Sequence, residues 1–158
     1  MSRLSERLKK KESFRSKPYL DCCGKYWRDC HCPTKGQLTA GIGRNLDAKG
    51  VSESEAAMLL DNDIAEATGQ AATFPWFAKL VSVRQEVVIE MIFNLGLEKF
   101  KGFKHAIEFI EAGQFFAVAE AMLRSKWADQ VGARATELAY MMEKGEYLPD
   151  APSEEAQS

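Results

Sequence analysis

The segment TAGIGRNL, residues 39–46, places a threonine ahead of a turn bracketed by two glycines. Two carboxylates precede it, Glu12 and, nine positions later, Asp21. Paired carboxylates suit the cleavage of a glycosidic bond, because one donates a proton to the leaving oxygen while the other acts on the attacking water. The order of these residues therefore predicts a glycosidase pair beside a small strand and turn.

Length and composition favour one domain over two independent ones. The chain has 158 residues, of which 46% are apolar, so it can bury a core of its own. We expect a single catalytic domain over residues 1–148, built as two lobes with a cleft between them. The polar residues 149–158, which include two prolines, are expected to be a disordered tail.

The charges are distributed unevenly along the chain. Residues 1–50 carry 12 Lys and Arg against 5 Asp and Glu, whereas residues 51–158 carry 9 against 18. A cationic first third suits an anionic polymer, which is a nucleic acid, an acidic lipid surface or a cell-wall glycan. The run from Lys9 to Lys11 fits a solvated helix face equally well.

The first residues do not resemble a secretory signal, because charged residues from Arg3 to Lys9 interrupt every apolar window. No apolar run approaches the roughly 18 residues of a membrane span, so stable membrane insertion is not expected. We expect a protein that is made and kept in the cytoplasm unless another protein lets it out.

The N-terminal pattern predicts a helix followed by a β region. Apolar residues at Leu4, Leu8 and Phe14 suit one side of a helix, which has to end before Pro18 and would carry Glu12 near its C-terminal end. Residues 19–46 hold glycines, aromatics and short apolar runs. They predict a small irregular β region, with turns at Gly24 and Gly36.

The remainder of the chain has helical spacing. Ser52 and Glu55 form the pattern of a capping box ahead of one long helix, and Ser82 and Gln85 repeat it ahead of a second helix that ends at Gly96. This second helix is apolar around nearly its whole circumference, so we expect it to be buried all round at the centre of the helical lobe. Three further helices are expected at about 103–112, 114–127 and 133–144. The expected fold is α+β, with a small β-containing N-terminal lobe joined by a long helix to a larger helical C-terminal lobe.

Several segments together resemble the phage lysozyme or endolysin family, glycoside hydrolase family 24, of the T-even phage lysozyme type. They are KESFRSKPYLD, TAGIGRNLDAKGVSESEA, FPWF, VRQ and FNLG, and the resemblance covers about residues 3–145. Neither the carboxylate spacing nor TAGIGRNLD is specific alone, but the combination is. The resemblance implies the lysozyme-like α+β fold.

The family pattern is a Glu, eight residues, an Asp or Cys, five residues and a Thr, and it assigns catalytic roles to Glu12, Asp21 and Thr39. Here seventeen residues separate Asp21 from Thr39, which indicates an insertion of about twelve. Two other positions depart from the pattern, since the family commonly has Gly at Ser13 and many members have His at Arg44.

The resemblance implies hydrolysis, with inversion, of the β-1,4 bond between N-acetylmuramic acid and N-acetylglucosamine in bacterial peptidoglycan. Glu12 has to stay protonated, through partial burial or a nearby acceptor, while Asp21 stays charged and acts on a water with Thr39. No cofactor is needed for this catalysis. Some relatives are lytic transglycosylases, and these residues fit that reaction too.

The resemblance also implies a monomer without nucleic-acid partners that accumulates in the host cytoplasm. It would reach the periplasm and cell wall after a separate holin permeabilises the membrane. Candidate substrate contacts are Gly41 and Gly43, whose backbone allows close approach of a sugar, and Asn94 and Arg134 from across the cleft. Asn94 fits a structural helix end equally well, and Arg134 a surface charge.

The insertion CCGKYWRDCHCPTKGQ, residues 22–37, is not explained by the resemblance. Four cysteines, Cys22, Cys23, Cys30 and Cys32, together with His31 are enough for a tetrahedral zinc site, although the spacing is not the paired C-x-x-C of zinc ribbons. Reduced thiols in a small hydrophobic turn are a second interpretation. Disulfides that form after release into an oxidising periplasm are a third.

The same insertion supports a non-enzymatic hypothesis. Tyr26 and Trp27 can stack on sugar faces or pack over the β region. With the cationic first third, they would suit a glycan- or nucleic-acid-binding module on a lysozyme-like scaffold without activity. The presence of Glu12, Asp21 and Thr39 favours the enzyme.

Overall fold

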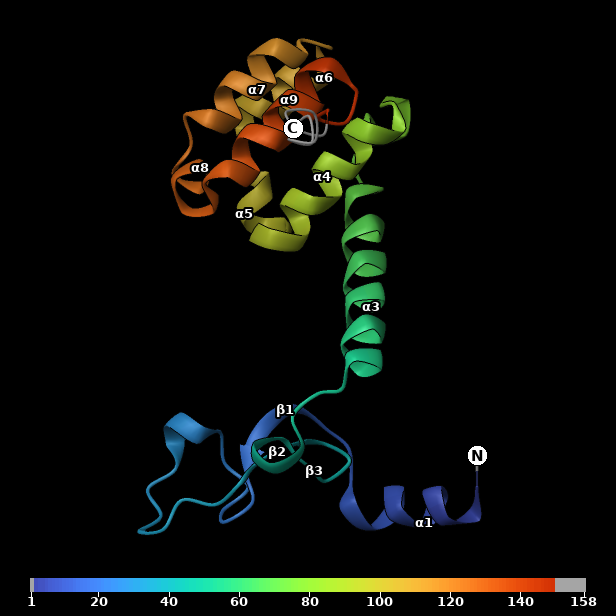
Figure 1. Ribbon diagram of the computed structural model, residues 1–158, viewed down its shortest axis with the longest axis vertical. Helices are drawn as coiled ribbons and strands as arrows, with labels where there is room; N and C mark the ends of the chain where they lie inside the picture. Colours follow the sequence, from blue (N-terminus) through green and yellow to red (C-terminus); the bar gives the residue numbers. More distant parts are fainter. Residues whose placement is uncertain (1, 150–158) are drawn as a thin grey trace, which may run out of the picture. The chain divides into compact units, whose positions relative to one another are not determined.

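The computed structural model describes residues 2–149 (Figure 1). The chain divides into two units, residues 1–58 and residues 59–158. The first contains a three-stranded antiparallel sheet and the second is helical, which confirms the expected α+β fold. Helix α3, Glu53–Ala71, begins in the first unit and continues into the second. The predicted tail lies, apart from Pro149, outside the described residues.

The first helix ends where the sequence predicts. Helix α1 spans Arg3–Glu12 and is capped by Ser2, whose side chain accepts a hydrogen bond from the Ser5 N–H. The chain leaves the helix at Ser13 with φ of 56° and ψ of 145°, a region that glycine adopts more readily than any other residue. A serine held there costs on the order of 1–3 kcal/mol, which gives a physical reason for the family's glycine.

The sheet has the strand order β1-β2-β3, with β1 at Arg15–Leu20, β2 at Leu38–Gly41 and β3 at Arg44–Asn45 (Figure 1). Tyr19 is opposite Thr39, and Thr39 is opposite Asn45 on its other side. Thr39 therefore lies in the central strand of the sheet.

The β region differs in detail from the expectation. Strand β1 begins at Arg15, and its pairing is irregular up to Tyr19, a stretch that includes Pro18, which lacks an N–H to donate. The turn at Gly24 is present, since the Gly24 N–H donates to the Leu20 carbonyl at 2.7 Å. The predicted turn at Gly36 is wrong, because the chain bends at residues 33–34 and residues 35–37 form an irregular segment ahead of β2.

Two short elements were not predicted in this unit. The loop between β1 and β2 contains a 3₁₀ turn at Trp27–Asp29, and Leu46–Lys49 forms the short helix α2. The Asn45 side chain caps α2 by accepting the Ala48 N–H at 2.9 Å. A short asparagine-capped turn of this kind leaves little periodic signal in the sequence.

The capping box at the start of α3 is confirmed. The Ser52 N–H donates to Glu55 Oε2 at 2.8 Å, and the Glu55 N–H donates back to Ser52 Oγ at 3.3 Å. These bonds satisfy donors that the first turn of a helix leaves unpaired. The bond from the Ser52 backbone also lowers the pKa of the Glu55 carboxyl.

The second unit is built from helices α4 to α9 and from the last part of α3 (Figure 1). Their bounds are α4 Ser82–Leu95, α5 Leu97–Lys101, α6 Lys104–Glu111, α7 Phe115–Leu123, α8 Lys126–Val131 and α9 Ala133–Lys144. The predicted single helix over 114–127 is wrong. It is divided because Ser125 accepts the Ala128 N–H and so begins α8.

Helix α4 packs into the core of this unit, although not on every side. Val87 and Val88 are fully buried, whereas 41% of Phe93 is exposed, so the expectation of a helix buried all round is wrong. Its end at Gly96 is confirmed by the Gly96 N–H, which donates to the Ile92 carbonyl at 2.7 Å. Phe74, Trp76 and Phe77, which the sequence places ahead of α4, belong to the same core.

The second predicted capping box is absent from the described structure. The N-cap of α4 is Val81, and the Gln85 side chain instead donates to the carbonyls of Phe77 and Leu80, at 3.2 and 3.1 Å. The Gln85 side chain therefore donates to carbonyl groups at the preceding 3₁₀ turn, Phe77–Lys79, and does not cap its own helix. Among the described residues, no helix has the length and apolar character needed to cross a membrane.

Candidate active site

Glu12 lies against the turn between β2 and β3. A Cβ atom built on Gly43 would come within 2.5 Å of Glu12 Oε2, so the carboxylate occupies the space that glycine leaves free. Gly43 also has φ of 68°, a conformation that suits glycine. The glycine therefore has two physical functions here: it forms the turn, and it admits the carboxylate.

Asp21 and Thr39 meet at the backbone of one residue, Gln37. Asp21 Oδ1 accepts the Gln37 N–H at 2.8 Å, and Thr39 Oγ1 donates to the Gln37 carbonyl at 3.2 Å. The Asp21 N–H donates to the same carbonyl at 3.2 Å. These bonds close the base of the inserted loop and bring Asp21 near Thr39 in space.

The three candidate catalytic residues differ in exposure. Glu12 and Asp21 are exposed, whereas only 6% of Thr39 is exposed. Within the first unit, the described residues therefore do not supply the partial burial expected of a general acid. The Thr39 proton is already donated to Gln37, so this hydroxyl presents its oxygen lone pairs as acceptors.

Arg44 connects the hairpin to the start of α3. Its Nε donates to the Gly50 carbonyl at 2.9 Å, and its guanidinium pairs with Glu55 at 2.6 Å. Because Glu55 is also part of the capping box, one carboxylate receives bonds from the β region and from the helix start. Arg44 therefore holds the turn in place, where many family members have a histidine.

Two candidate substrate contacts lie in the second unit, and both have partners inside it. Asn94 Oδ1 accepts the Trp127 indole N–H at 3.0 Å, which supports the structural interpretation of this residue. Arg134 pairs with Glu90. Both residues of that pair line a hollow of about 320 Å³ in this unit, together with apolar side chains such as Phe93. A substrate contact by either Asn94 or Arg134 stays a prediction.

The aromatic residues of the inserted loop remain accessible. Tyr26 is 41% exposed and Trp27 47% exposed, and their ring centroids are 5.9 Å apart. The Arg28 guanidinium lies 4.9 Å from the centroid of the Trp27 ring. Tyr26 also lines a surface hollow of about 860 Å³ beside β1. Both rings are therefore available for stacking.

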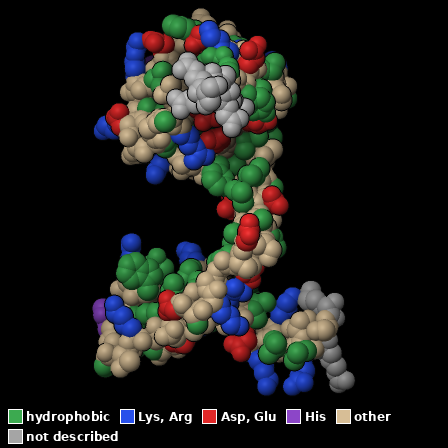
Figure 2. All heavy atoms as spheres, in the orientation of Figure 1, with side chains coloured by type: hydrophobic (Ala, Val, Ile, Leu, Met, Phe, Trp, Pro, Cys, Tyr) green, Lys and Arg blue, Asp and Glu red, His purple; other side chains and the backbone are tan. Residues whose placement is uncertain are grey.

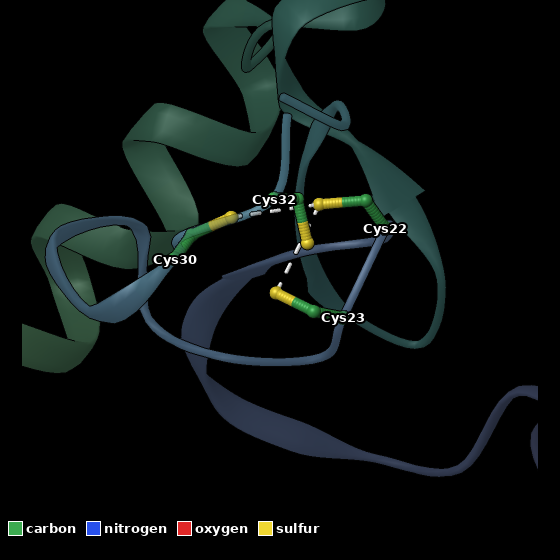
Figure 3. Close-up of side chains that lie close together, drawn as sticks. All are labelled: Cys22, Cys23, Cys30 and Cys32. Atoms are coloured by element: carbon green, nitrogen blue, oxygen red, sulfur yellow. Dashed lines mark hydrogen bonds between the residues drawn. The ribbon is translucent and has the colours of Figure 1, made fainter. Parts of the chain in front are cut away.

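The four cysteines of the loop converge, with their sulfur atoms facing one another (Figure 3). The N–H of Cys32 donates to the Cys30 sulfur and is the main cause that lowers the pKa of Cys30 to about 7. Hydrogen bonds with Cys22, Cys30 and Cys23, which favour the protonated thiol, raise the pKa of Cys32 to about 12. One thiol of the group is therefore much more acidic than another.

Comparison with known proteins identifies the family. The model of the family described as phage lysozyme matches residues 9–140, which include every candidate site residue from Glu12 to Arg134. The chain belongs to the phage lysozyme family. A probable T4-type lysozyme 1 of Dictyostelium discoideum is 25% identical over 99 residues. That match covers 60% of this chain and 58% of the relative, so the chain spans less than two thirds of the relative's length.

In this phage lysozyme family member, two residues that hold the site together, Gly36 and Gln37, are not recognisable as such from residue type and spacing. A Cβ atom at Gly36 would lie 2.1 Å from Asp21 Oδ1, so only glycine fits beside the carboxylate. Gln37 joins Asp21 to Thr39 through its backbone, and a backbone contact leaves no mark on residue type. The glycine was visible in the sequence, but its spacing suggested a turn.

Replacing Gly43 by Ala is expected to displace the Glu12 carboxylate. The new Cβ would overlap Glu12 Oε2, and the flexible carboxylate would move away, so wall hydrolysis should fall by about 10²-fold because catalytic groups tolerate little misplacement. The positive φ should also lower the free energy of unfolding by about 1–2 kcal/mol. Turbidity assays and thermal melts measure both effects.

Gly50→Ala is the matched control for this prediction. Gly50 has φ of 58° in the same unit, but a Cβ there meets no atom within 4 Å. This variant should lose similar stability and keep its activity. Equal activity of the folded Gly43→Ala and Gly50→Ala proteins would show that the contact between Glu12 and Gly43 does not matter for catalysis.

Proposed function

We propose that this protein is a muramidase that hydrolyses the β-1,4 bond between N-acetylmuramic acid and N-acetylglucosamine in bacterial peptidoglycan. The observation that carries the proposal is the arrangement in the first unit, where Glu12 lies on Gly43 of the hairpin that also contains Thr39, and Gln37 links Thr39 to Asp21. Membership of the phage lysozyme family supports the same reaction class.

In this mechanism Glu12 donates its proton to the oxygen of the leaving sugar. Asp21 remains ionised, stabilises the positive charge that develops at the sugar carbon and accepts a proton from the attacking water. The Thr39 oxygen accepts a hydrogen bond from that water, since its own proton is directed to Gln37. Attack on the face opposite the leaving group inverts the anomeric configuration, as the family resemblance implies.

The charge of the first unit suits an anionic polymer. Exposed Lys10 and Lys11 lie on α1, and Figure 2 shows Lys and Arg side chains over the part of the chain that carries this helix. Peptidoglycan carries carboxylates on its stem peptides, so long-range attraction would raise its local concentration. Tyr26 and Trp27 are candidates for stacking on sugar faces.

The biological role that we propose is lysis of a bacterial host, with cell wall degradation as the antimicrobial event. The enzyme would act as a monomer in the periplasm after a separate holin opens the membrane, having accumulated in the host cytoplasm. It would need no cofactor for catalysis, no nucleic acid and no stable membrane insertion.

Digestion of purified peptidoglycan in ¹⁸O-labelled water tests the reaction type. Hydrolysis should give fragments that end in a reducing N-acetylmuramic acid and carry one labelled oxygen, because the water supplies the new hydroxyl. Mass spectrometry of the fragments is the measurement. Unlabelled 1,6-anhydro ends would show a lytic transglycosylase instead. Sedimentation with intact sacculi, without soluble fragments, would show a glycan-binding module and overturn the enzyme.

A further inference from the structure

The cysteines of the inserted loop have the geometry of a metal site. The sulfur atoms of Cys22, Cys23, Cys30 and Cys32 all lie within 4.8 Å of one another. Cys22 Sγ is 3.8 Å from Cys23 Sγ and 3.7 Å from Cys30 Sγ. In a tetrahedral thiolate site with Zn–S bonds of about 2.3 Å, neighbouring sulfur atoms are about 3.8 Å apart. The separations of Cys22 Sγ from Cys23 Sγ and from Cys30 Sγ agree with that edge length.

Two turns of the chain bring these residues together. Cys22 and Cys23 lie in the turn after β1, where the N–H groups of Cys23 and Gly24 both donate to the Leu20 carbonyl. Cys30 and Cys32 follow the 3₁₀ turn Trp27–Asp29, and the backbone at Cys30 is extended. Figure 3 shows the two pairs facing each other across the loop.

We propose that Cys22, Cys23, Cys30 and Cys32 bind one Zn²⁺ ion that holds the inserted loop closed. Four thiolates exclude calcium and magnesium, which prefer oxygen ligands, and favour zinc in a closed structural site. Binding forms four Zn–S bonds, releases the four thiol protons and changes no oxidation state. The bound site would carry two negative charges, and Lys25, Arg28 and Lys35 of the same loop offset them.

The two other interpretations of the cysteines fit this geometry less well. Two disulfides need only two close pairs, whereas here every sulfur lies close to the other three. Thiols that serve as small apolar residues should be buried, but Cys22 and Cys23 are exposed and the other two are only half-buried. A metal ion shared by the four sulfur atoms explains both why they converge and why they are not buried in an apolar core.

Gly36 connects the proposed site to the base of the loop. A Cβ atom built on Gly36 would lie 2.6 Å from the Cys22 backbone nitrogen and 2.9 Å from Cys22 Cβ. Gly36 contacts Asp21 as well, so the proposed site adjoins the closed base of the loop without including Asp21 among its ligands.

The zinc content of the purified protein tests the proposal independently of enzymatic activity. The full-length protein, produced without a metal-affinity tag in zinc-supplemented medium and purified with reductant but no chelator, should hold about one zinc per chain by elemental mass spectrometry. Replacement of zinc by Co²⁺ should give the visible bands of tetrahedral cobalt and a thiolate charge-transfer band in the near ultraviolet. Removal of zinc by a chelator should lower the melting temperature of the protein.

Variants assign the ligands. Cys30→Ser and Cys32→Ser should each lose most of the bound zinc, and Cys22→Ser and Cys23→Ser should behave alike. His31→Ala is the matched control, because His31 lies between two of the ligands but is exposed and does not belong to the described cluster. It should retain about one zinc per chain. Loss of zinc from His31→Ala alone would overturn the assignment of four cysteine ligands.

Measurements on the wild-type protein test zinc binding even if a variant does not fold. A reduced protein that holds no zinc and gives no tetrahedral bands with added Co²⁺ would overturn the proposal. So would a mass lower by four hydrogens before reduction, which indicates two disulfides, or iron in place of zinc. None of these results would affect the proposed muramidase activity, which the product analysis measures separately.

Discussion

Replacing Glu12 by Gln is expected to lower peptidoglycan hydrolysis by about 10²–10⁴-fold and to leave the fold unchanged. The amide has nearly the same size, so it fits above Gly43 as the carboxylate does. It has no acidic proton to give to the leaving oxygen. The loss of turbidity of a peptidoglycan suspension measures the rate, and circular dichroism with a thermal melt measures the fold.

Glu6→Gln is the control for this change. Glu6 is an exposed residue in the first turn of the same helix α1. Its replacement removes the same charge from the same unit but does not alter the contact with Gly43 in the β2–β3 turn. It should hydrolyse peptidoglycan at close to the parent rate. A folded Glu12→Gln protein that cleaves the wall as fast as Glu6→Gln would remove Glu12 from the mechanism.

Replacing Asp21 by Asn is expected to lower hydrolysis by about 10²–10³-fold, since a neutral amide does not stabilise positive charge at the sugar carbon. The asparagine Oδ1 still accepts the Gln37 N–H, so the base of the loop should remain closed. The melting temperature should therefore change little. A cysteine at this position should retain part of the activity, because the family pattern includes Cys there.

Asp47→Asn separates this loss from a structural one. Asp47 Oδ2 accepts the Leu38 N–H at 2.6 Å, just as Asp21 Oδ1 accepts the N–H of the preceding residue, Gln37. The two variants change the same chemical group at neighbouring backbone positions. If Asp47→Asn lost as much activity as Asp21→Asn, the loss of a hydrogen bond to the backbone ahead of β2 would explain both results. Asp21 would then have no separate catalytic role.

Much of the local structure was predictable from short segments. The end of α1 at Glu12, the capping box of Ser52 and Glu55 and the end of α4 at Gly96 all follow from interactions between residues three or four apart. The family pattern adds the order of Glu12, Asp21 and Thr39. Such features depend on residue type and spacing, which the sequence displays directly.

Errors arose where a local pattern competed with a tertiary contact. Ser82 and Gln85 have the spacing of a capping box, but Gln85 donates to Phe77 and Leu80 because the packed 3₁₀ turn leaves these carbonyls within its reach. Gly36 was expected in a turn and instead makes room for the Asp21 carboxylate. In each case the partner belongs to another element, and residue spacing carries no information about it.

By itself, the sequence determined which residues are candidates for the chemistry, because carboxyl groups, hydroxyls and thiols are properties of side chains. Only the tertiary structure decided that Glu12 lies on Gly43, that Gln37 joins Asp21 to Thr39, and that four sulfur atoms separated by up to ten positions converge. The physical reason is the register of the sheet. Pairing Tyr19 with Thr39 brings together the two ends of the inserted loop, and that pairing depends on contacts twenty residues apart.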